Sequence, residues 1–519
     1  MEYQGGNENK TPEPSLSEPA RSEASTVPHE RPAWVKASRR PLVLAATVAT
    51  ILISAIEGTI VATVMPQIVG QLGGFDLFSW VFTAYLLTQA VTIPIYGRLA
   101  DVYGRKRMLL IAIGIFLVGS VLCGCAWNMI ALIGFRVVQG LGAGALIPIS
   151  QTVVGDLYTP AERARIQGYL SSIWAVGSIL GPLIGAFLIA HTIWPMVFWV
   201  NVPIGLIAAL LLVLWLHEDL QHRDHRIDYR GSILMMAGTG LLMFALVQAT
   251  RLSLATLVSL IAASLAILVM FFVHERSAPE PMLPLPLLRN RVIAAGNIAC
   301  LALGAIIIGA SAFLSLYVQG VMGRSAIAAG IVLMTPSVSW PIGSSLGGWM
   351  MLRTSYRSTA AVGAAPLILG CLVMILLNPS LGPVAAGFGA ALIGIGMGFT
   401  NNTFTVAIQG SVGWAQRGIA TSTMAFTRIV GQALGAALFG GTINAELAQQ
   451  HAPRDIVDRV MDPVLRQALS AQEIAPLTAA IGRGLHNVYL ITGVLTLVVL
   501  ATALALPAGL SPLRGSRRP

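Results

Sequence analysis

The sequence predicts an all-α transmembrane protein with fourteen membrane-spanning helices, and three observations support this fold class. Only 10% of the 519 residues are charged, whereas a soluble domain carries roughly a quarter. The mean hydropathy is +0.76 and 55% of the residues are hydrophobic, which is more apolar surface than a soluble core can hold. The apolar residues also form blocks long enough to cross a hydrocarbon layer, which takes roughly 20 helical residues.

Charged or Pro/Gly-rich loops separate the predicted helices. The first apolar block begins near Leu42 after a polar leader, so we expect residues 1–41 to form a disordered cytoplasmic tail. The predicted spans are 42–68, 78–99, 108–126, 129–154, 165–190, 194–216, 231–250, 254–273, 292–318, 326–348, 359–377, 383–409, 418–442 and 485–506.

These spans are grouped into three parts. An N-terminal six-helix bundle (42–216) is followed by two inserted helices with flanking loops (217–291) and a C-terminal six-helix bundle (292–507), before a short tail (508–519). The second bundle includes one long outer loop, 443–484, in which residues 455–469 have a weakly helical, amphipathic pattern. This loop either caps the outer mouth of the protein or is a surface excursion.

The distribution of basic residues predicts the orientation. Of the 32 Lys and Arg residues, 24 fall on the side that holds both termini and 6 on the other, while Arg136 and Arg428 lie within spans. By the positive-inside rule, both termini are cytoplasmic and the protein is a multi-pass protein of the cell membrane. Because the basic residues are dispersed among short loops, the net charge of +10 does not indicate a nucleic-acid partner.

The loop after the second predicted helix reads GRLADVYGRKR at residues 97–107. Glycines at a sharp turn, a carboxylate at a helix end and a basic cluster can hold neighbouring helix ends together. The loop resembles the signature between helices 2 and 3 of the major facilitator superfamily. The resemblance implies a gating motif made of Gly97, Asp101, Gly104, Arg105 and Arg107. If the arginines only enforced topology, Asp101 and the spaced glycines would remain unexplained.

Three further segments resemble the fourteen-span drug:proton antiporter branch of that superfamily. They read RVVQGLGAG at 136–144, GSILGPLIG at 177–185 and FWVNVPIG at 198–205, and the resemblance extends over about 42–507. The second segment is similar to the antiporter motif, which implies roles for Gly177, Gly181, Pro182 and Gly185. Glycines four residues apart let another helix approach closely, and Pro182 removes a backbone hydrogen bond. The alternative is that these glycines only pack helices.

Glu57 is the only acidic residue deep within a predicted span. A carboxylate in hydrocarbon is costly and is a functional candidate for that reason. Its segment, IEGTIVATVMP at 56–66, resembles the helix 1 motif of the same branch, in which many members have Asp at this position. Arg136 is the expected partner, since both residues fall in the middle or outer part of the membrane. We interpret Glu57 as a proton carrier with Arg136 as its modulator; the alternative is a permanent ion pair.

Arg428 is the other cation within a span, and the second half of the chain offers no buried acid to neutralise it. It could meet backbone carbonyls, a lipid headgroup or an anionic part of a substrate, and a structural role is favoured. Several polar or aromatic residues within spans are candidates for lining a mainly apolar cavity, the alternative being packing between helices. These candidates are Tyr85, Gln89, Gln151, Trp174, Tyr317, Asn401 and Asn402.

The chain has no P-loop, HExxH or CxxC pattern, which disfavours ATP-driven pumping and metalloenzyme chemistry. The resemblance implies a transporter, not an enzyme, that exports lipophilic or cationic drugs by alternating access and proton antiport. It needs no cofactor or metal besides the coupling proton, works as a monomer in the lipid bilayer and binds a small-molecule substrate. The alternatives are a dedicated exporter of an endogenous lipid, siderophore or metabolite, and a membrane sensor or scaffold that transports nothing.

Overall fold

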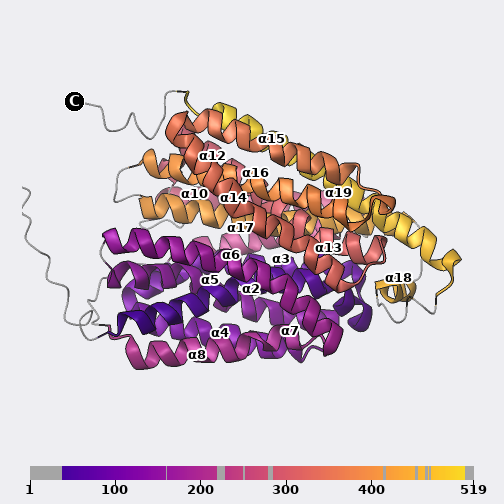
Figure 1. The fold of residues 1–519 in the computed structure, drawn as a ribbon, viewed down its shortest axis with the longest axis horizontal. Helices are drawn as coiled ribbons and strands as arrows, with labels where there is room; N and C mark the ends of the chain where they lie inside the picture. Colours follow the sequence, from indigo (N-terminus) through magenta and orange to yellow (C-terminus); the bar gives the residue numbers. More distant parts are fainter. Residues whose placement is uncertain are drawn as a thin grey trace, which may run out of the picture.

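The computed structural model describes most of the chain as a bundle of long, roughly parallel helices (Figure 1). The described residues are 38–158, 160–218, 228–248, 252–278, 285–412, 417–449, 454–461, 466 and 469–508. The predicted disordered tails, 1–41 and 508–519, therefore lie outside the described residues except for 38–41 and 508. Within that exception, Arg40 and Pro41 already belong to the first described helix.

The N-terminal half is built from helices that contact one another directly. Its elements are α2 (Arg40–Leu72), η1 (Phe75–Leu77), α3 (Phe78–Tyr103), α4 (Arg105–Gly124), α5 (Met129–Leu157), α6 (Pro160–His191), α7 (Met196–Trp199) and α8 (Asn201–Trp215). Helix α2 contacts α5, α6 and α8, while α5 contacts α3 and α4. These contacts make α2 the central helix of this half.

The C-terminal half begins with one long column in which helical geometry changes along its length. The column comprises α12 (Arg291–Ile308), the π-helix η2 (Gly309–Phe313), α13 (Leu314–Leu316) and the π-helix η3 (Tyr317–Val321). It is followed by α14 (Ala326–Arg353), α15 (Tyr356–Ile375), η4 (Pro379–Leu381), α16 (Gly382–Gly410), α17 (Arg417–Gln449), α18 (Arg454–Met461) and α19 (Ala471–Ala505). Helix α16 packs on α14 and α15, and α12 packs on α17 and α19.

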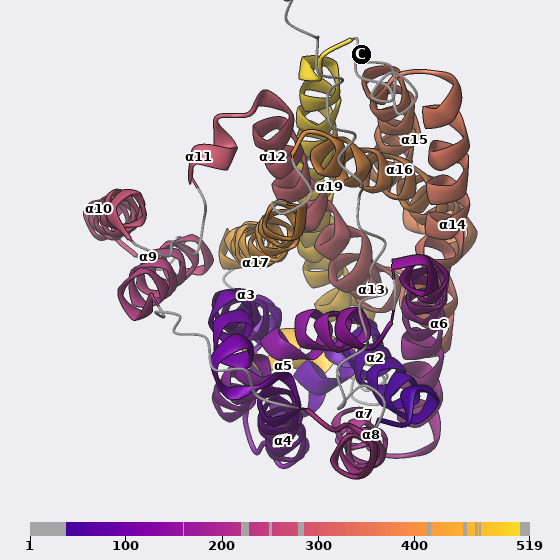
Figure 2. The ribbon, with the colours of Figure 1, turned by 90° about the vertical axis from the view of Figure 1, so that its left-hand side faces the viewer.

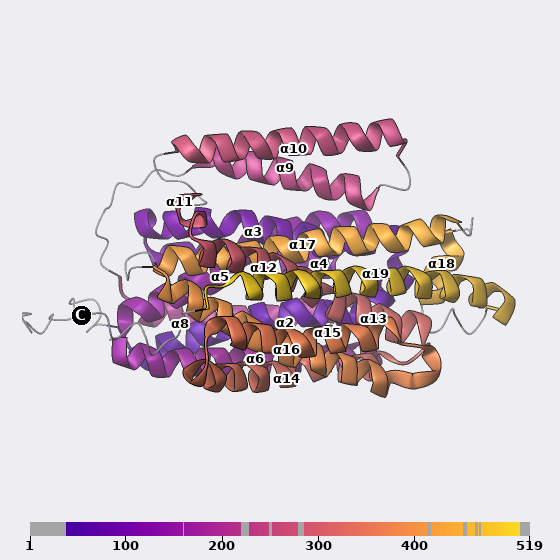
Figure 3. The same ribbon diagram turned by 90° about the horizontal axis from the view of Figure 1, so that it is seen from above.

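Helices α9 (Tyr229–Val247) and α10 (Leu254–Ser277) form a pair beside the two halves, as Figures 2 and 3 show. Helix α9 contacts α3 and α17, whereas α10 contacts mainly α9 and leaves apolar side chains such as Val258 and Val269 exposed.

Asp228 caps the N-terminus of α9. Burial would raise the pKa of this carboxyl, but hydrogen bonds from Gly231 and His274 hold the pKa below its usual value. The short helix α11 (Leu285–Leu288) leads into α12.

Twelve helices in the described part of the chain are long and apolar enough to cross a membrane. They match twelve of the fourteen predicted spans, and the two others, 165–190 and 418–442, are also helical, within α6 and α17. In α6 the apolar part found is Val176–His191, and α17 carries Arg428 among its polar residues. Helix α6 contacts α2 and α14, and α17 contacts α3, α9, α12 and α19.

The ends of several predicted spans are corrected by the structure. The sixth span is interrupted at Val200, because Pro203 has no N–H to donate to the carbonyl of Trp199. The last helix begins at Ala471 instead of 485, where Ser470 and Glu473 form a capping box. Helix α17 runs on to Gln449 and α18 occupies part of the intervening segment, so the predicted outer loop 443–484 is largely helical.

The bundle has two ends that the following sections name by their residues. At the tail end, α2 begins and α19 ends; at the cap end, α18 lies against α2, η1, η3 and α19 (Figure 1). Helix α18 belongs to the C-terminal half by sequence but contacts the N-terminal half through α2 and η1. It therefore links the two halves at the cap end.

Candidate functional site

Glu57 and Arg136 meet inside the N-terminal half. Glu57 comes from the middle of α2 and Arg136 from the first turns of α5, and they are 1% and 2% exposed. Nη1 of Arg136 donates a hydrogen bond to Oε1 of Glu57, so the two form a buried ion pair. Taking two charges out of water is expensive, and such a pair persists only where further hydrogen bonds satisfy both groups.

Arg136 receives that support from three directions. Nη1 also donates to Oε1 of Gln139 at 2.6 Å, and Nε donates to the carbonyl of Val81 on α3 at 3.2 Å. The guanidinium carbon lies 4.0 Å from the centre of the Tyr85 ring, within range of a cation–π interaction. Tyr85 was predicted to line a substrate cavity, and the structure places its buried ring against Arg136.

The second oxygen of Glu57 is held by Asn201. Nδ2 of Asn201 donates to Oε2 of Glu57 at 2.6 Å, and Asn201 is fully buried. The interruption at Val200 sets Asn201 at the start of α8, facing α2. Sequence reasoning quoted this segment but assigned Asn201 no role. The available signal was that Asn201 is the only amide or charged residue between Met196 and Trp215.

This network couples the charge of one carboxyl to contacts among four helices. While Glu57 is ionised, it neutralises Arg136 and accepts a hydrogen bond from Asn201. When Glu57 is protonated, the attraction to Arg136 is lost and the guanidinium keeps its contacts with Gln139, Val81 and Tyr85. A proton can thus change how tightly α2 is held to α5 and α8.

The predicted antiporter motif lies on the opposite side of α2. A Cβ added at Gly177 would come 2.6 Å from Cβ of Ala55, and one added at Gly181 would come 2.0 Å from Oγ1 of Thr59. Gly185 packs in the same way against α2 one turn further along. Both distances are below van der Waals contact, so these glycines are what allow α6 to lie so close to the helix that carries Glu57.

The other face of α6 contacts the C-terminal half. A Cβ added at Gly330 of α14 would lie 3.0 Å from the carbonyl oxygen of Pro182, and Oγ of Ser337 donates to the carbonyl of Ser178 at 3.2 Å. Helix α6 is therefore packed between α2 and α14. A change in the packing of α2 can reach the second half through this helix.

The predicted gating motif lies at the tail end. Gly104 has a φ of 92°, which favours glycine, and forms the turn between α3 and α4. The backbone N–H groups of Arg105 and Lys106 both donate to the carboxylate of Glu218 at 2.8 Å, and Arg105 also forms ion pairs with Glu218 and Asp156. Glu218 thus caps the N-terminus of α4, where a negative charge is favourable.

Sequence reasoning had expected the acid in this motif to be Asp101 and did not single out Glu218. The side chain of Asp101 lies outside the described residues, while Gly97 and Arg107 are exposed. The signal for Glu218 was an acidic residue directly after a predicted span. A helix N-terminus and a nearby carboxylate meet here only because α8 ends beside the start of α4.

The predicted cavity residues come from both halves of the protein. Gln89 is buried in α3, Gln151 is exposed on α5, and the side chain of Trp174 lies outside the described part. The Tyr317 hydroxyl donates to the carbonyl of Leu377, and Nδ2 of Asn402 donates to the carbonyl of Ser344, so these two side chains join helices of the C-terminal half. Asn401 is half-buried, and its Oδ1 has no hydrogen-bond partner among the described residues.

At the cap end the two halves are joined by several hydrogen bonds. The carboxylate of Asp458 on α18 accepts from the backbone N–H groups of Gly74 and Phe75 at 3.0 and 2.9 Å. Nε2 of Gln319 donates to the carbonyl of Thr63 at 2.7 Å. These contacts tie the end of α2 to the second half.

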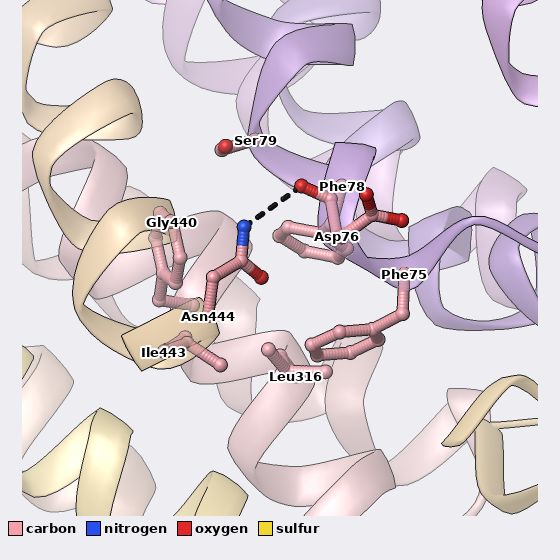
Figure 4. A pocket seen from close by; sticks show the side chains of 9 residues that line it. Phe75, Asp76, Phe78, Ser79, Leu316, Gly440, Ile443 and Asn444 are labelled. Carbon is pink, nitrogen blue, oxygen red and sulfur yellow. Dashed lines mark hydrogen bonds between the residues drawn. The ribbon is translucent and has the colours of Figure 1, made fainter. Parts of the chain in front are cut away.

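A small pocket lies between the two halves at the cap end (Figure 4). The figure shows Asp76 on one side and Asn444 on the other, and Nδ2 of Asn444 donates to the carbonyl of Asp76 at 2.9 Å. Phe75 and Phe78 from the first half and Phe313 from the second complete much of the wall. Aromatic packing and backbone hydrogen bonds therefore hold the cap end together.

Comparison with known proteins agrees with this geometry. The chain matches the Major Facilitator Superfamily over residues 47–436, which is most of its length. It belongs to the major facilitator superfamily. It is therefore a multi-pass membrane transporter of small molecules, and not an enzyme.

Two curated relatives carry names that describe drug transport. The chain is 35% identical over 393 residues to Multidrug resistance protein 3 of Bacillus subtilis (strain 168), covering 75% of this chain and 77% of that one. It is 33% identical over 413 residues to Multidrug transporter protein MdtP of the same organism, covering 79% and 76%. Relatives of this member of the superfamily are thus named as multidrug transporters.

Solved structures share its fold at low identity. A bacterial homologue of the human lysosomal transporter Spinster, in an inward-facing and unoccupied conformation, has a TM-score of 0.66 at 18% identity and covers 90% of this chain and 96% of that one. The nucleoside transporter NupG has a TM-score of 0.60 at 13% identity, covering 89% and 99%. These likenesses support the all-helical fold of the superfamily.

Proposed function

We propose that the protein is a fourteen-span drug:proton antiporter that exports lipophilic or cationic compounds from the cell. The observation that carries this proposal is the buried Glu57–Arg136 pair, whose carboxyl is the one acidic group deep within a predicted span. The names of the two B. subtilis relatives favour drugs as the substrate class. In this proposal α6 and α17 are spans as well, and one chain carries the complete transport unit.

The proposed cycle uses a proton to change the packing of α2. Protonation of Glu57 from outside releases its charge interaction with Arg136, and deprotonation to the cytoplasm restores it. Helix α6 lies between α2 and α14 and passes this change to the second half, so that residues 42–216 and 292–507 rock against each other. Substrate leaves as the proton enters.

In the same proposal, the tail end faces the cytoplasm and the cap end faces outward. The excess of Lys and Arg on the side of both termini supports this orientation. The contacts of Asp458, Gln319 and Asn444 between the two halves then close the outward side. The described arrangement corresponds to a state that receives substrate from the cytoplasm.

Ethidium accumulation in cells tests the proposal. Cells expressing wild-type protein are expected to accumulate less ethidium than cells with empty vector, and a protonophore should abolish the difference. The Glu57→Gln variant, which keeps the shape of the side chain but cannot carry a proton, should behave like empty vector at equal membrane levels.

Glu446→Gln is the matched control. Glu446 lies on α17 at the cap end and pairs with Arg483 at 3.3 Å, away from Glu57, so this change of acid to amide should leave export unchanged. Export by Glu57→Gln equal to wild type would rule out Glu57 as the proton carrier. No difference between wild type and empty vector would rule out broad drug export and point to a dedicated exporter of an endogenous compound.

A further inference from the structure

Arg428 is a cation in the C-terminal half that the proposed cycle does not use. It lies on α17, and its backbone is packed tightly against α12: a Cβ added at Gly304 would come 2.1 Å from the carbonyl oxygen of Arg428. The residue is half-buried. Among the described residues, Arg428 forms no ion pair and no side-chain hydrogen bond, and its Nε atom is buried without a partner.

The register of α17 assigns Arg428 to the side of the helix that meets α16. Thr421 and Met424, which are seven and four residues earlier, share this face because a helix turns once in 3.6 residues. Nε2 of Gln409 on α16 donates to Oγ1 of Thr421 at 3.2 Å, and Oγ1 of Thr405 lies 3.8 Å from the sulfur of Met424. Arg428 therefore shares a helix face with two residues that contact α16, and its Nε atom is buried.

The same register sets Asn401 opposite Arg428. Helices α16 and α17 run in opposite directions, and Thr405 faces Met424. The residue four positions before Thr405 on α16 is therefore at the same depth as the residue four positions after Met424 on α17. These positions are Asn401 and Arg428. Oδ1 of Asn401 is buried without a partner, like Nε of Arg428, and no hydrogen bond joins the two side chains. Two facing helices thus present an unsatisfied acceptor and an unsatisfied cation at one depth.

The neighbouring polar groups do not fill this need. Oγ1 of Thr427 donates to Oδ1 of Asn297 at 2.9 Å, and Nδ2 of Asn297 donates to the carbonyl of Ile293 at 2.8 Å. They satisfy one another along α12 and α17. Other buried polar atoms of the described residues also lack a partner, but Arg428 and Asn401 combine an unpaired cation with an unpaired acceptor on two adjacent helices, which is the pattern that a ligand with an acidic group can complete.

We propose that Arg428 and Asn401 form a binding subsite for the acidic group of a transported compound, which rests on the proposed function as a small-molecule exporter. A guanidinium pairs best with the two oxygens of a carboxylate or phosphate. Oδ1 of Asn401 accepts a hydrogen bond from a hydroxyl or N–H next to that group. The subsite therefore selects lipophilic acids.

Equilibrium binding without a proton gradient tests the subsite separately from transport. Purified full-length protein in phosphatidylcholine nanodiscs is titrated with decanoic acid and 2-hydroxydecanoic acid, and with the neutral primary amide of each; only the second acid carries a hydroxyl beside its carboxylate. Wild-type protein is expected to bind the acids at least about tenfold more tightly than the amides, the effect of one hydrogen bond to a charged group. No preference for the acids, or no binding of any of them, would overturn the proposal.

Variants identify the residues responsible. Arg428→Gln should remove the preference for acids and leave amide affinity within about twofold, and Arg428→Lys should retain part of the preference. Asn401→Leu should weaken the binding of 2-hydroxydecanoic acid by about tenfold and leave that of decanoic acid within about twofold. Arg483→Gln, which removes an arginine at the cap end, is the matched control and should bind like wild type. If Arg428→Gln elutes in size-exclusion chromatography as wild type does but loses affinity for acids and amides equally, Arg428 has a structural role and the subsite is overturned.

Two further readouts separate the possible sources of the acid and the two proposals. Adding phosphatidylglycerol to the nanodiscs should compete with the acids in wild type only if a lipid headgroup is the occupant, which would support the subsite and assign its ligand. Ethidium export by the control variant Arg483→Gln should equal that of wild type. Loss of ethidium export in wild type would overturn the proposed function, whereas loss of acid preference would overturn the subsite alone.

Discussion

Arg136 on α5 and Arg428 on α17 have opposite surroundings. Arg136 is 2% exposed and contacts Glu57, Gln139, the carbonyl of Val81 and the ring of Tyr85. Arg428 is half-buried and has no such partner among the described residues. The first charge is neutralised inside the protein, whereas the second is available to something else. The charge of Arg136 is therefore paired with a carboxylate, whereas that of Arg428 has no such partner among the described residues.

The largest expected effect on stability is that of Arg136→Met. This change leaves Glu57 buried without its cation, so we expect a loss of about 3 to 5 kcal/mol in the free energy of unfolding. Thermal or denaturant unfolding of the purified variant in detergent measures it. Combining the change with Glu57→Gln should restore part of the loss. A variant as stable as wild type would mean that the ion pair is not what holds α2 and α5 together.

A smaller effect is expected for Asn201→Leu. The substitution removes the hydrogen bond to Oε2 of Glu57, and hydrogen bonds to charged groups contribute about 1.5 to 3 kcal/mol. Unfolding of the variant should be easier by this amount. The matched control is Asn487→Leu at the cap end, which removes the hydrogen bond from Asn487 to Glu446. Asn128→Leu would not serve as a control, because Asn128 caps α5. An equal loss in both variants would deny Asn201 any special role.

Gly181→Ala probes the close approach of α6 to the Glu57 helix. The added methyl group would lie 2.0 Å from Oγ1 of Thr59, and overpacking of this kind costs about 1 to 3 kcal/mol. The matched control is Gly58→Ala, because a Cβ at Gly58 meets no atom within 4 Å. There the replacement should stabilise the helix by about 0.5 to 1 kcal/mol. The same sign of change at both positions would contradict the tight contact between α6 and α2.

The smallest change in stability is expected for Arg428→Met. It removes a cation whose Nε is buried without a partner, so the free energy of unfolding should stay the same or rise by about 1 kcal/mol. The measurement is the same unfolding experiment used for Arg136→Met, which makes the two results directly comparable. A loss of more than about 2 kcal/mol would show that Arg428 contributes to the fold as Arg136 does.

Much of the fold could be predicted from the sequence, but the exact points at which some helices begin or are interrupted could not. The positions of twelve spans agree with the structure because each depends on a local run of apolar residues. The interruption at Val200 and the early start of the last helix depend on Pro203 and on the capping box at Ser470. These residues were visible in the sequence, yet their effect on helix ends was not anticipated.

The candidate site shows the same division. The sequence singled out Glu57 and Arg136 because charged residues stand out in apolar segments. It gave no role to Asn201 or Glu218, and it assigned Tyr85 to a cavity. Their contacts join α8 to α2, α8 to α4 and α3 to α5, and these helices are far apart along the chain. A pattern in one helix does not reveal which side chain of another helix it meets.

Amino-acid composition and motifs were enough to assign this protein to a membrane and to its superfamily, and to single out Glu57, Arg136 and Arg428 as charges among apolar residues. Only the tertiary structure decided which of these charges are paired. Hydropathy acts along one helix and is readable from consecutive residues, whereas the cost of a buried charge depends on partners that packing brings from other helices. Arg136 and Arg428 have similar apolar neighbours in sequence and differ because only one of them faces a carboxylate.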